Sequence, residues 1–254
     1  MLKATIAIIA SLLTFIPAVL SATDPIGGRY SFSLTTFSPN GKLPQLSHAI
    51  KATTLGSPIV AVRNLNGIAL ASLQTLPSPL MNDNGTPTFF KITNSIVLGH
   101  TGVNADGRVV ANAAQRLAVE HAFTFQEEIP INVLLEELAL LFQDYTMKAG
   151  VRPFGCSIVV ASANDGIFAI DPAGTVTKVD QGVLILGKGN NEENIGNIKK
   201  SVQDHHTSQD MERILEKTIK ENFTEFGVLS NCQSVIIASA SVKEDKFKSS
   251  KISP

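Results

Sequence analysis

The chain has few of the residue patterns from which catalytic and metal sites are commonly built. Its two cysteines, Cys156 and Cys232, are far apart and match no metal-ligand spacing. We expect them to be free buried thiols, although a disulfide between them stays open. The motifs Gly-x-Ser-x-Gly, His-Glu-x-x-His and Cys-x-x-Cys are absent. The sequence therefore predicts no metal, no cofactor and no ordinary hydrolytic site.

Charge is also scarce. Only 17% of the 254 residues are charged and the formal net charge is −1, which gives no electrostatic case for nucleic-acid binding. The hydrophobic fraction of 44% is ordinary for a globular protein. We expect one large domain with a substantial core.

The N-terminal residues 1–22 differ from the rest. Lys3 precedes an apolar run from Ala4 to Leu20, and the run ends in the small-x-small pattern Val19-Leu-Ser-Ala22. This pattern is typical of a secretory signal peptide. Pro17 and the length of the run argue against a transmembrane helix. The other interpretation is a start codon placed too far upstream, so that the working protein lacks these residues.

Periodicity predicts strands first, then two helices, strands, two helices and a last strand. The helices are expected at residues 43–54, 106–123, 130–149, 192–204 and 208–223. The strands are expected at residues 58–62, 67–73, 89–93, 95–99, 156–161, 166–170, 175–179, 183–186 and 234–240. This order fits two stacked sheets with helix pairs on both outer faces. The Lys- and Ser-rich tail, residues 243–254, is expected to be disordered.

Three ordered segments carry a resemblance to a known family. They are Gly28-Arg-Tyr-Ser-Phe-Ser-Leu-Thr-Thr-Phe-Ser-Pro-Asn-Gly-Lys-Leu43, Asp144-Tyr-Thr-Met-Lys-Ala-Gly-Val-Arg-Pro-Phe-Gly155 and Asp171-Pro-Ala-Gly174. Together they resemble the alpha-type subunits of the proteasome core particle, most of all the second alpha-type subunit. The resemblance implies an α/β (α+β) fold, the four-layer αββα sandwich of the N-terminal-nucleophile hydrolases, over residues 23–242.

The resemblance also implies a function. Alpha-type subunits form a seven-membered ring outside the beta-ring subunits, close the axial pore and receive the C-terminal tails of activators or of the regulatory particle. They serve ubiquitin-dependent protein degradation in cytoplasm and nucleus, and they are not themselves enzymes. The alternative is a secreted or organelle-targeted paralogue with the same fold and a binding role, which the leader supports.

Four positions match the gate region of the family. Tyr30 corresponds to a gate tyrosine, and Pro39 to the proline of a turn whose position is linked to opening. Gly41 completes that turn, where we expect a Cβ to clash. His48 stands where the family has a second gate tyrosine, and Ser47 where it has a glutamate, so gating is expected to be altered. For a lone histidine, ordinary packing or surface exposure is the competing interpretation.

Arg63 aligns with the family's pocket lysine, which meets an activator's terminal carboxylate. Arginine keeps the charge and can bind a carboxylate with two hydrogen bonds, but its geometry differs from that of lysine. A surface arginine at a strand end is the competing interpretation.

Removal of the leader would expose Thr23 as an N-terminal threonine, the nucleophile type of the proteasome. We reject this assignment, because Thr23 lies in a linker ahead of the alpha-type segment and does not begin a core strand.

Overall fold

The computed structural model describes residues 35–64, 67–75, 87–179 and 182–188, residues 190 and 196, and strands at 232–241 and 248–252. The leader, Thr23, Tyr30 and the two helices expected at 192–204 and 208–223 lie outside the described residues. Within the described part, no helix has the length and apolar character that a membrane span requires.

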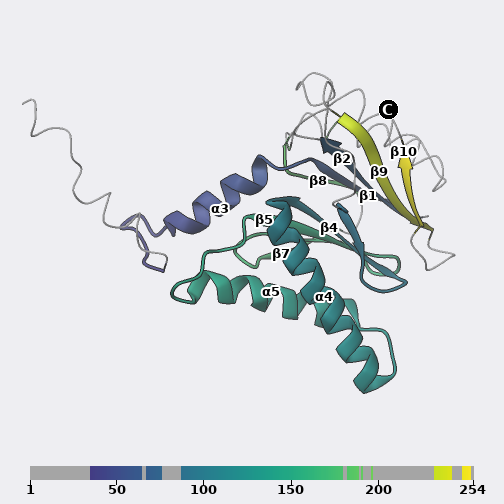
Figure 1. The fold of residues 1–254 in the computed structure, drawn as a ribbon, viewed down its shortest axis with the longest axis horizontal. Helices are drawn as coiled ribbons and strands as arrows, with labels where there is room; N and C mark the ends of the chain where they lie inside the picture. Colours follow the sequence, from purple (N-terminus) through teal and green to yellow (C-terminus); the bar gives the residue numbers. More distant parts are fainter. Residues whose placement is uncertain are drawn as a thin grey trace, which may run out of the picture.

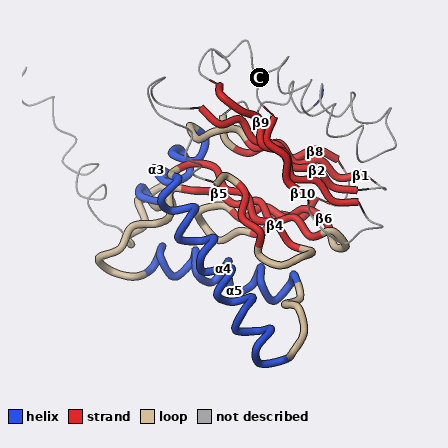
Figure 2. Tube along the Cα trace, turned by 45° about the vertical axis from the view of Figure 1, so that its right-hand side comes forward, coloured by secondary structure: helices blue, strands red, loops and turns tan. Residues whose placement is uncertain are grey.

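Two antiparallel five-stranded sheets form the centre of the fold (Figure 1, Figure 2). The first has the order β10-β9-β2-β1-β8 and the second the order β3-β4-β5-β6-β7. The first sheet consists of β1 (Ile59–Asn64), β2 (Gly67–Thr75), β8 (Gly182–Leu186), β9 (Cys232–Ser241) and β10 (Lys248–Ile252). The second consists of β3 (Phe89–Lys91), β4 (Ile96–Gly102), β5 (Cys156–Ser162), β6 (Gly166–Ile170) and β7 (Val176–Val179).

Three helices are described. Helices α4 (Asn104–Phe125) and α5 (Ile131–Met147) cover the outer face of the second sheet, and α3 (Pro44–Thr54) extends from one end of the sandwich (Figure 1). The predicted hairpin of β1 and β2 is present, with Asn64 paired to Gly67. Helix α5 begins one residue later than predicted, because the backbone of Pro130 is extended and its carbonyl accepts the bond from Leu134 N.

Strand β5 explains why the described layers stack. All seven of its residues are buried, and they alternate between two clusters. Ile158 and Val160 pack beneath α4 and α5, whereas Val159 and Ala161 face the first sheet. A strand buried on both faces loses the polar alternation of a half-exposed strand. The α+β fold class is therefore confirmed by two helices and two antiparallel sheets in successive layers.

Helical spacing predicts a core face of α5 formed by Leu134, Leu138, Leu141 and Tyr145, and all four pack against the core cluster. Leu134 and Leu138 are fully buried, and Tyr145 packs partly buried against the same cluster. Leu135 and Phe142 are also buried, although the predicted face omitted them. The apolar face of α5 is wider than one stripe because α5 contacts both α4 and the sheet.

One expectation about the C-terminal segment needs revision. The segment 243–254 was expected to be disordered, but residues 248–252 form β10, which pairs with the edge of β9. The two strands are joined by backbone ladder bonds, and lysines are common on such edge strands.

Cys156 is a free buried thiol, as predicted, and the side chain of Cys232 lies outside the described residues. Burial, and then the nearby Asp106 carboxylate, raise the pKa of Cys156 to about 12.

Candidate functional site

A turn at Ser38 to Gly41 lies just before α3. Gly41 N donates to Ser38 O at 2.8 Å, and Ser38 N donates to Lys42 O at 2.8 Å. Pro39 occupies the second position of this turn, where its fixed φ is suitable. Gly41 has a φ of +70°, and no atom of the described residues lies within 4 Å of a Cβ built at this position. The expectation of a Cβ clash was therefore wrong, and glycine suits this position because of its left-handed backbone.

Helix α3 is held by few contacts. Pro44 lies in its first turn, where proline is tolerated, and the N-cap residue Leu43 makes no side-chain cap bond. Only Ala49 and Thr53 are buried, whereas His48 lies exposed on the helix surface. Phe37, ahead of the turn, is 62% exposed. The turn and α3 thus present apolar and ionisable side chains to the exterior.

The C-terminal end of α3 is fixed tightly to the sandwich. A Cβ on Gly56 would lie 2.1 Å from Gly102 N, so the two backbones approach as only glycine allows. Thr101 Oγ1 donates to Ser57 O at 2.6 Å, and Lys188 N donates to Gly56 O at 3.0 Å. We define residues 35–55 as the gate segment, after the role that the family resemblance implies, and these bonds anchor it at its C-terminal end.

Arg63 lies near the far end of β1, four residues beyond Ile59. Its Nη1 donates to Asp165 O at 2.9 Å and its Nη2 to Asn164 O at 3.5 Å, in the turn between β5 and β6. Because β1 starts directly after the α3 anchor, an extended strand places Arg63 about 13 Å further along the sandwich. The structure brings Pro39, Gly41 and His48 together in one segment, but it does not bring Arg63 to them.

The segment Val151 to Gly155 forms a second distinctive region. Arg152 donates to Asp106 through two bonds, from Nη1 to Oδ2 at 2.6 Å and from Nη2 to Oδ1 at 2.8 Å. Gly155 N adds a bond to Asp106 Oδ2 at 2.9 Å. Burial alone would raise the pKa of Asp106, but these donors outweigh it and lower the pKa below its ordinary value. This ion pair ties the start of β5 to the first turn of α4.

Aromatic packing continues the same junction. The ring of Phe154 lies 5.2 Å from Phe142 and 4.3 Å from Tyr145, measured between centroids. Edge-on and tilted contacts at these distances are favourable. We call Asp106, Phe142, Tyr145, Arg152 and Phe154 the helix–sheet junction. Arg152 is exposed and the other four members are buried or half-buried, and their bonds and ring contacts indicate a structural role.

The third family-like segment is also structural. Asp171 Oδ1 accepts bonds from Ala173 N at 3.0 Å and Thr175 N at 2.8 Å, which closes the turn between β6 and β7. Among the described residues, no group of three or more His, Cys, Asp or Glu is placed to hold a metal ion.

Comparison with known proteins decides the family. The family model described as "Proteasome subunit" matches residues 53–237, more than half of the chain. The chain belongs to the proteasome subunit family. A rice (Oryza sativa subsp. indica) protein named proteasome subunit alpha type-2 is 33% identical over 187 residues, which cover 72% of this chain and 76% of that protein. The Drosophila melanogaster alpha type-2 subunit is 37% identical over 149 residues, or 58% of this chain and 64% of that protein.

The alpha type-2 subunit of Trypanosoma brucei brucei is 34% identical over 148 residues. The chain is therefore a divergent relative of proteasome alpha type-2 subunits, as its three segments indicated.

Sequence reasoning had missed the partner of Arg152, although an acidic residue in the first turn of a helix was a usable signal. It also missed a pocket beside α4, which depends on tertiary contacts that no motif records.

Proposed function

We propose that this protein is a non-catalytic alpha-ring subunit of the proteasome core particle. It acts in ring assembly, pore gating and regulator docking during ubiquitin-dependent protein degradation, in cytoplasm and nucleus. The observation that carries the proposal is the similarity to alpha type-2 subunits over 72% of the chain. Alpha-type relatives contribute shape and interfaces to the complex, and assembly with other proteasome subunits follows from membership.

The exposed apolar side chains support assembly. Phe123 is 82% exposed near the C-terminal end of α4, and Val119 and Phe125 are also exposed on that half of the helix. Such clusters are uncommon on soluble monomers and mark protein interfaces. We define Val119 and Phe123, which lie one helical turn apart on the same face of α4, as the α4 apolar patch. In the proposed ring or between stacked rings, a neighbouring subunit would cover it.

Affinity purification from the source cells tests assembly. A C-terminally tagged chain is expected to co-purify with other alpha-ring and beta-ring subunits and to migrate in the size range of a core particle. Migration as a monomer, without any other core subunit, would contradict the proposal. A threonine-directed electrophile applied to the purified chain is expected to leave Thr23 unmodified.

His48 offers a specific test of gating. We expect His48→Tyr to restore the hydroxyl that the family uses to hold an open gate, and His48→Phe to serve as the control without it. One hydrogen bond of about 1 kcal/mol corresponds to roughly a fivefold change in the open population. Peptide hydrolysis by the activator-bound particle should therefore rise about fivefold with His48→Tyr. Equal rates for both variants would show that position 48 takes no part in gating.

Docking of a regulator tail at Arg63 is a separate part of the proposal. Two of the guanidinium N–H groups donate to backbone carbonyls, and the guanidinium carries five such groups in all. A tail peptide with a free C-terminus should bind the particle more tightly than its amidated form. Arg63→Gln should abolish that difference, and a difference that persists would place the carboxylate site elsewhere.

The secretory alternative depends on residues 1–22, which lie outside the described residues. The similarity to alpha type-2 subunits gives it no support. N-terminal sequencing of the mature protein separates the two: an end at Thr23 favours secretion, and an end near Gly27 favours a leader that the working protein lacks.

A further inference from the structure

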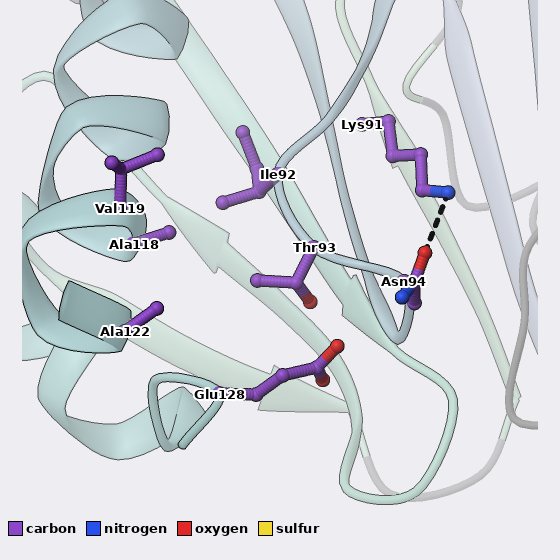
Figure 3. Close-up of a pocket in the computed structure, with 8 residues that line it drawn as sticks. All are labelled: Lys91, Ile92, Thr93, Asn94, Ala118, Val119, Ala122 and Glu128. Carbon is purple, nitrogen blue, oxygen red and sulfur yellow. Dashed lines mark hydrogen bonds between the residues drawn. The ribbon is translucent and has the colours of Figure 1, made fainter. Parts of the chain in front are cut away.

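A pocket of about 380 Å³ lies between the second half of α4 and the turn that joins β3 to β4 (Figure 3). Its apolar wall consists of Ala118, Val119 and Ala122 from α4, opposite Ile92. Glu128, from the connection between α4 and α5, points its carboxylate toward Thr93 at the base of this space (Figure 3). The pocket is therefore apolar along the α4 wall and acidic at one end.

Hydrogen bonds fix the acidic end. Ser95 Oγ donates to Glu128 Oε2 at 2.8 Å, which holds the carboxylate in place. Thr93 Oγ1 lies 3.2 Å from Ser95 Oγ and accepts a bond from Ile96 N at 3.1 Å. Gln115 Nε2 donates to Lys91 O at 2.9 Å and joins α4 to the end of β3. The site is thus pre-organised, so a ligand would not have to order it.

The electrostatics favour a cation. The pocket lies beside the C-terminal half of α4, whose macrodipole is negative at that end, and the last turn of α4 has no basic residue. Lys91 also lines the pocket, but its Nζ donates to Asn94 Oδ1 at 2.8 Å, on the side away from α4 (Figure 3). Glu128 is therefore the charge that faces the apolar wall.

We propose that this pocket receives a single arginine side chain from a neighbouring subunit of the core particle. The methylene stem lies along Ile92 and Val119, and the guanidinium bonds to the Glu128 carboxylate. Arginine combines an apolar stem with a fork that matches a carboxylate, whereas an acidic tail would be repelled. The neighbour is a subunit because Val119 belongs both to the pocket wall and to the α4 apolar patch. This inference rests on the proposed function.

A charge-neutral variant tests the pocket in the assembled particle. Glu128→Gln keeps the size of the side chain and an oxygen that can accept from Ser95. The matched control is Glu136→Gln, an exposed glutamate on α5. We expect Glu128→Gln to weaken retention of one neighbouring subunit about tenfold at low salt, and Glu136→Gln to leave it unchanged. Equal retention for both variants would overturn the inference.

Photo-crosslinking identifies the occupant. With p-benzoylphenylalanine at Val119, irradiation of the assembled particle should attach one neighbouring subunit at a peptide that contains an arginine next to the attachment site. Exchanging the charges, with Glu128→Arg here and glutamate for that arginine in the neighbour, should restore retention that either change alone reduces. Attachment to a segment without arginine overturns the inference. A wild-type chain that joins no particle overturns the proposed function, and this inference with it.

Discussion

The gate segment and the helix–sheet junction both contain family-like motifs, but they use them in different ways. In the junction, Phe142 is fully buried and Asp106 is 8% exposed, and both are held by several partners. In the gate segment, Phe37 and His48 are exposed, and the described contacts are mainly those of a turn and one helix face. The helix–sheet junction packs within the domain, whereas the gate segment presents side chains to the exterior.

This difference has a physical consequence. Buried and hydrogen-bonded groups contribute to the free energy of unfolding of the isolated chain, whereas exposed groups contribute little until a partner covers them. Changes in the junction should therefore lower stability in the monomer. Changes in the gate segment should leave stability nearly constant and affect the proposed assembly.

A pair of phenylalanine truncations gives the largest expected contrast. Phe142→Ala removes a buried ring that packs against Phe154, and should lower the free energy of unfolding by about 3–5 kcal/mol. Phe37→Ala removes an exposed ring and should change it by less than about 0.5 kcal/mol. Chemical denaturation of both purified variants measures the difference. Similar losses in the two variants would show that Phe37 is covered in the monomer.

The junction ion pair should have the next largest effect. Asp106→Asn removes the carboxylate that accepts from Arg152 and from Gly155 N, and should cost about 2 kcal/mol. Asp144→Asn is the matched control, because Asp144 pairs with Lys148 on an exposed helix face and should cost less than about 0.5 kcal/mol. Equal costs would mean that burial adds nothing to the Asp106–Arg152 pair.

The same pair predicts a dependence on pH. Because the folded-state pKa of Asp106 is lowered from its ordinary 3.8, its stabilisation is fully present above that value. The stabilisation is lost as the pH falls from 3.8 through the lower folded-state pKa. The gap of about 2 kcal/mol between the wild-type chain and Asp106→Asn should thus be constant from pH 7 to about 5 and shrink below about pH 4. A gap that stays constant to pH 3 would mean that the bonds to Asp106 do not depend on its charge.

The sequence predicted helices and turns well where a local residue pattern was enough to specify them. Turn residues marked the start of α3, and helical periodicity located α4 and α5 within a few residues. The family resemblance supplied the layered fold, which periodicity alone could not choose. The width of the buried face of α5 was underestimated, because Leu135 and Phe142 are buried by α4 and the sheet together.

The candidate site was less predictable, since it depends on contacts between distant residues. The docking role of Arg63 was predicted by alignment with the family. Its bonds to the turn at Asn164 and Asp165 depend on the stacking of the two sheets, which the alignment does not show. The acidic pocket joins Ile92, Val119 and Glu128, which belong to separate elements. An edge strand such as β10 forms only by pairing with a neighbouring strand, here β9. The Lys- and Ser-rich composition of the segment does not predict that pairing.

The smallest predicted effect concerns Gly41. Its φ of +70° costs an L-residue about 1 kcal/mol, and no atom of the described residues would obstruct a Cβ. Gly41→Ala should therefore destabilise the turn by about 1 kcal/mol, and Gly41→Asn by less, because asparagine tolerates this conformation better. Since α3 has few buried side chains, global unfolding should change little, whereas hydrogen exchange of amides in residues 41–47 should accelerate about fivefold. A steric explanation predicts equal effects of alanine and asparagine or a larger effect of the bulkier asparagine, so the order of the two variants decides between volume and backbone conformation.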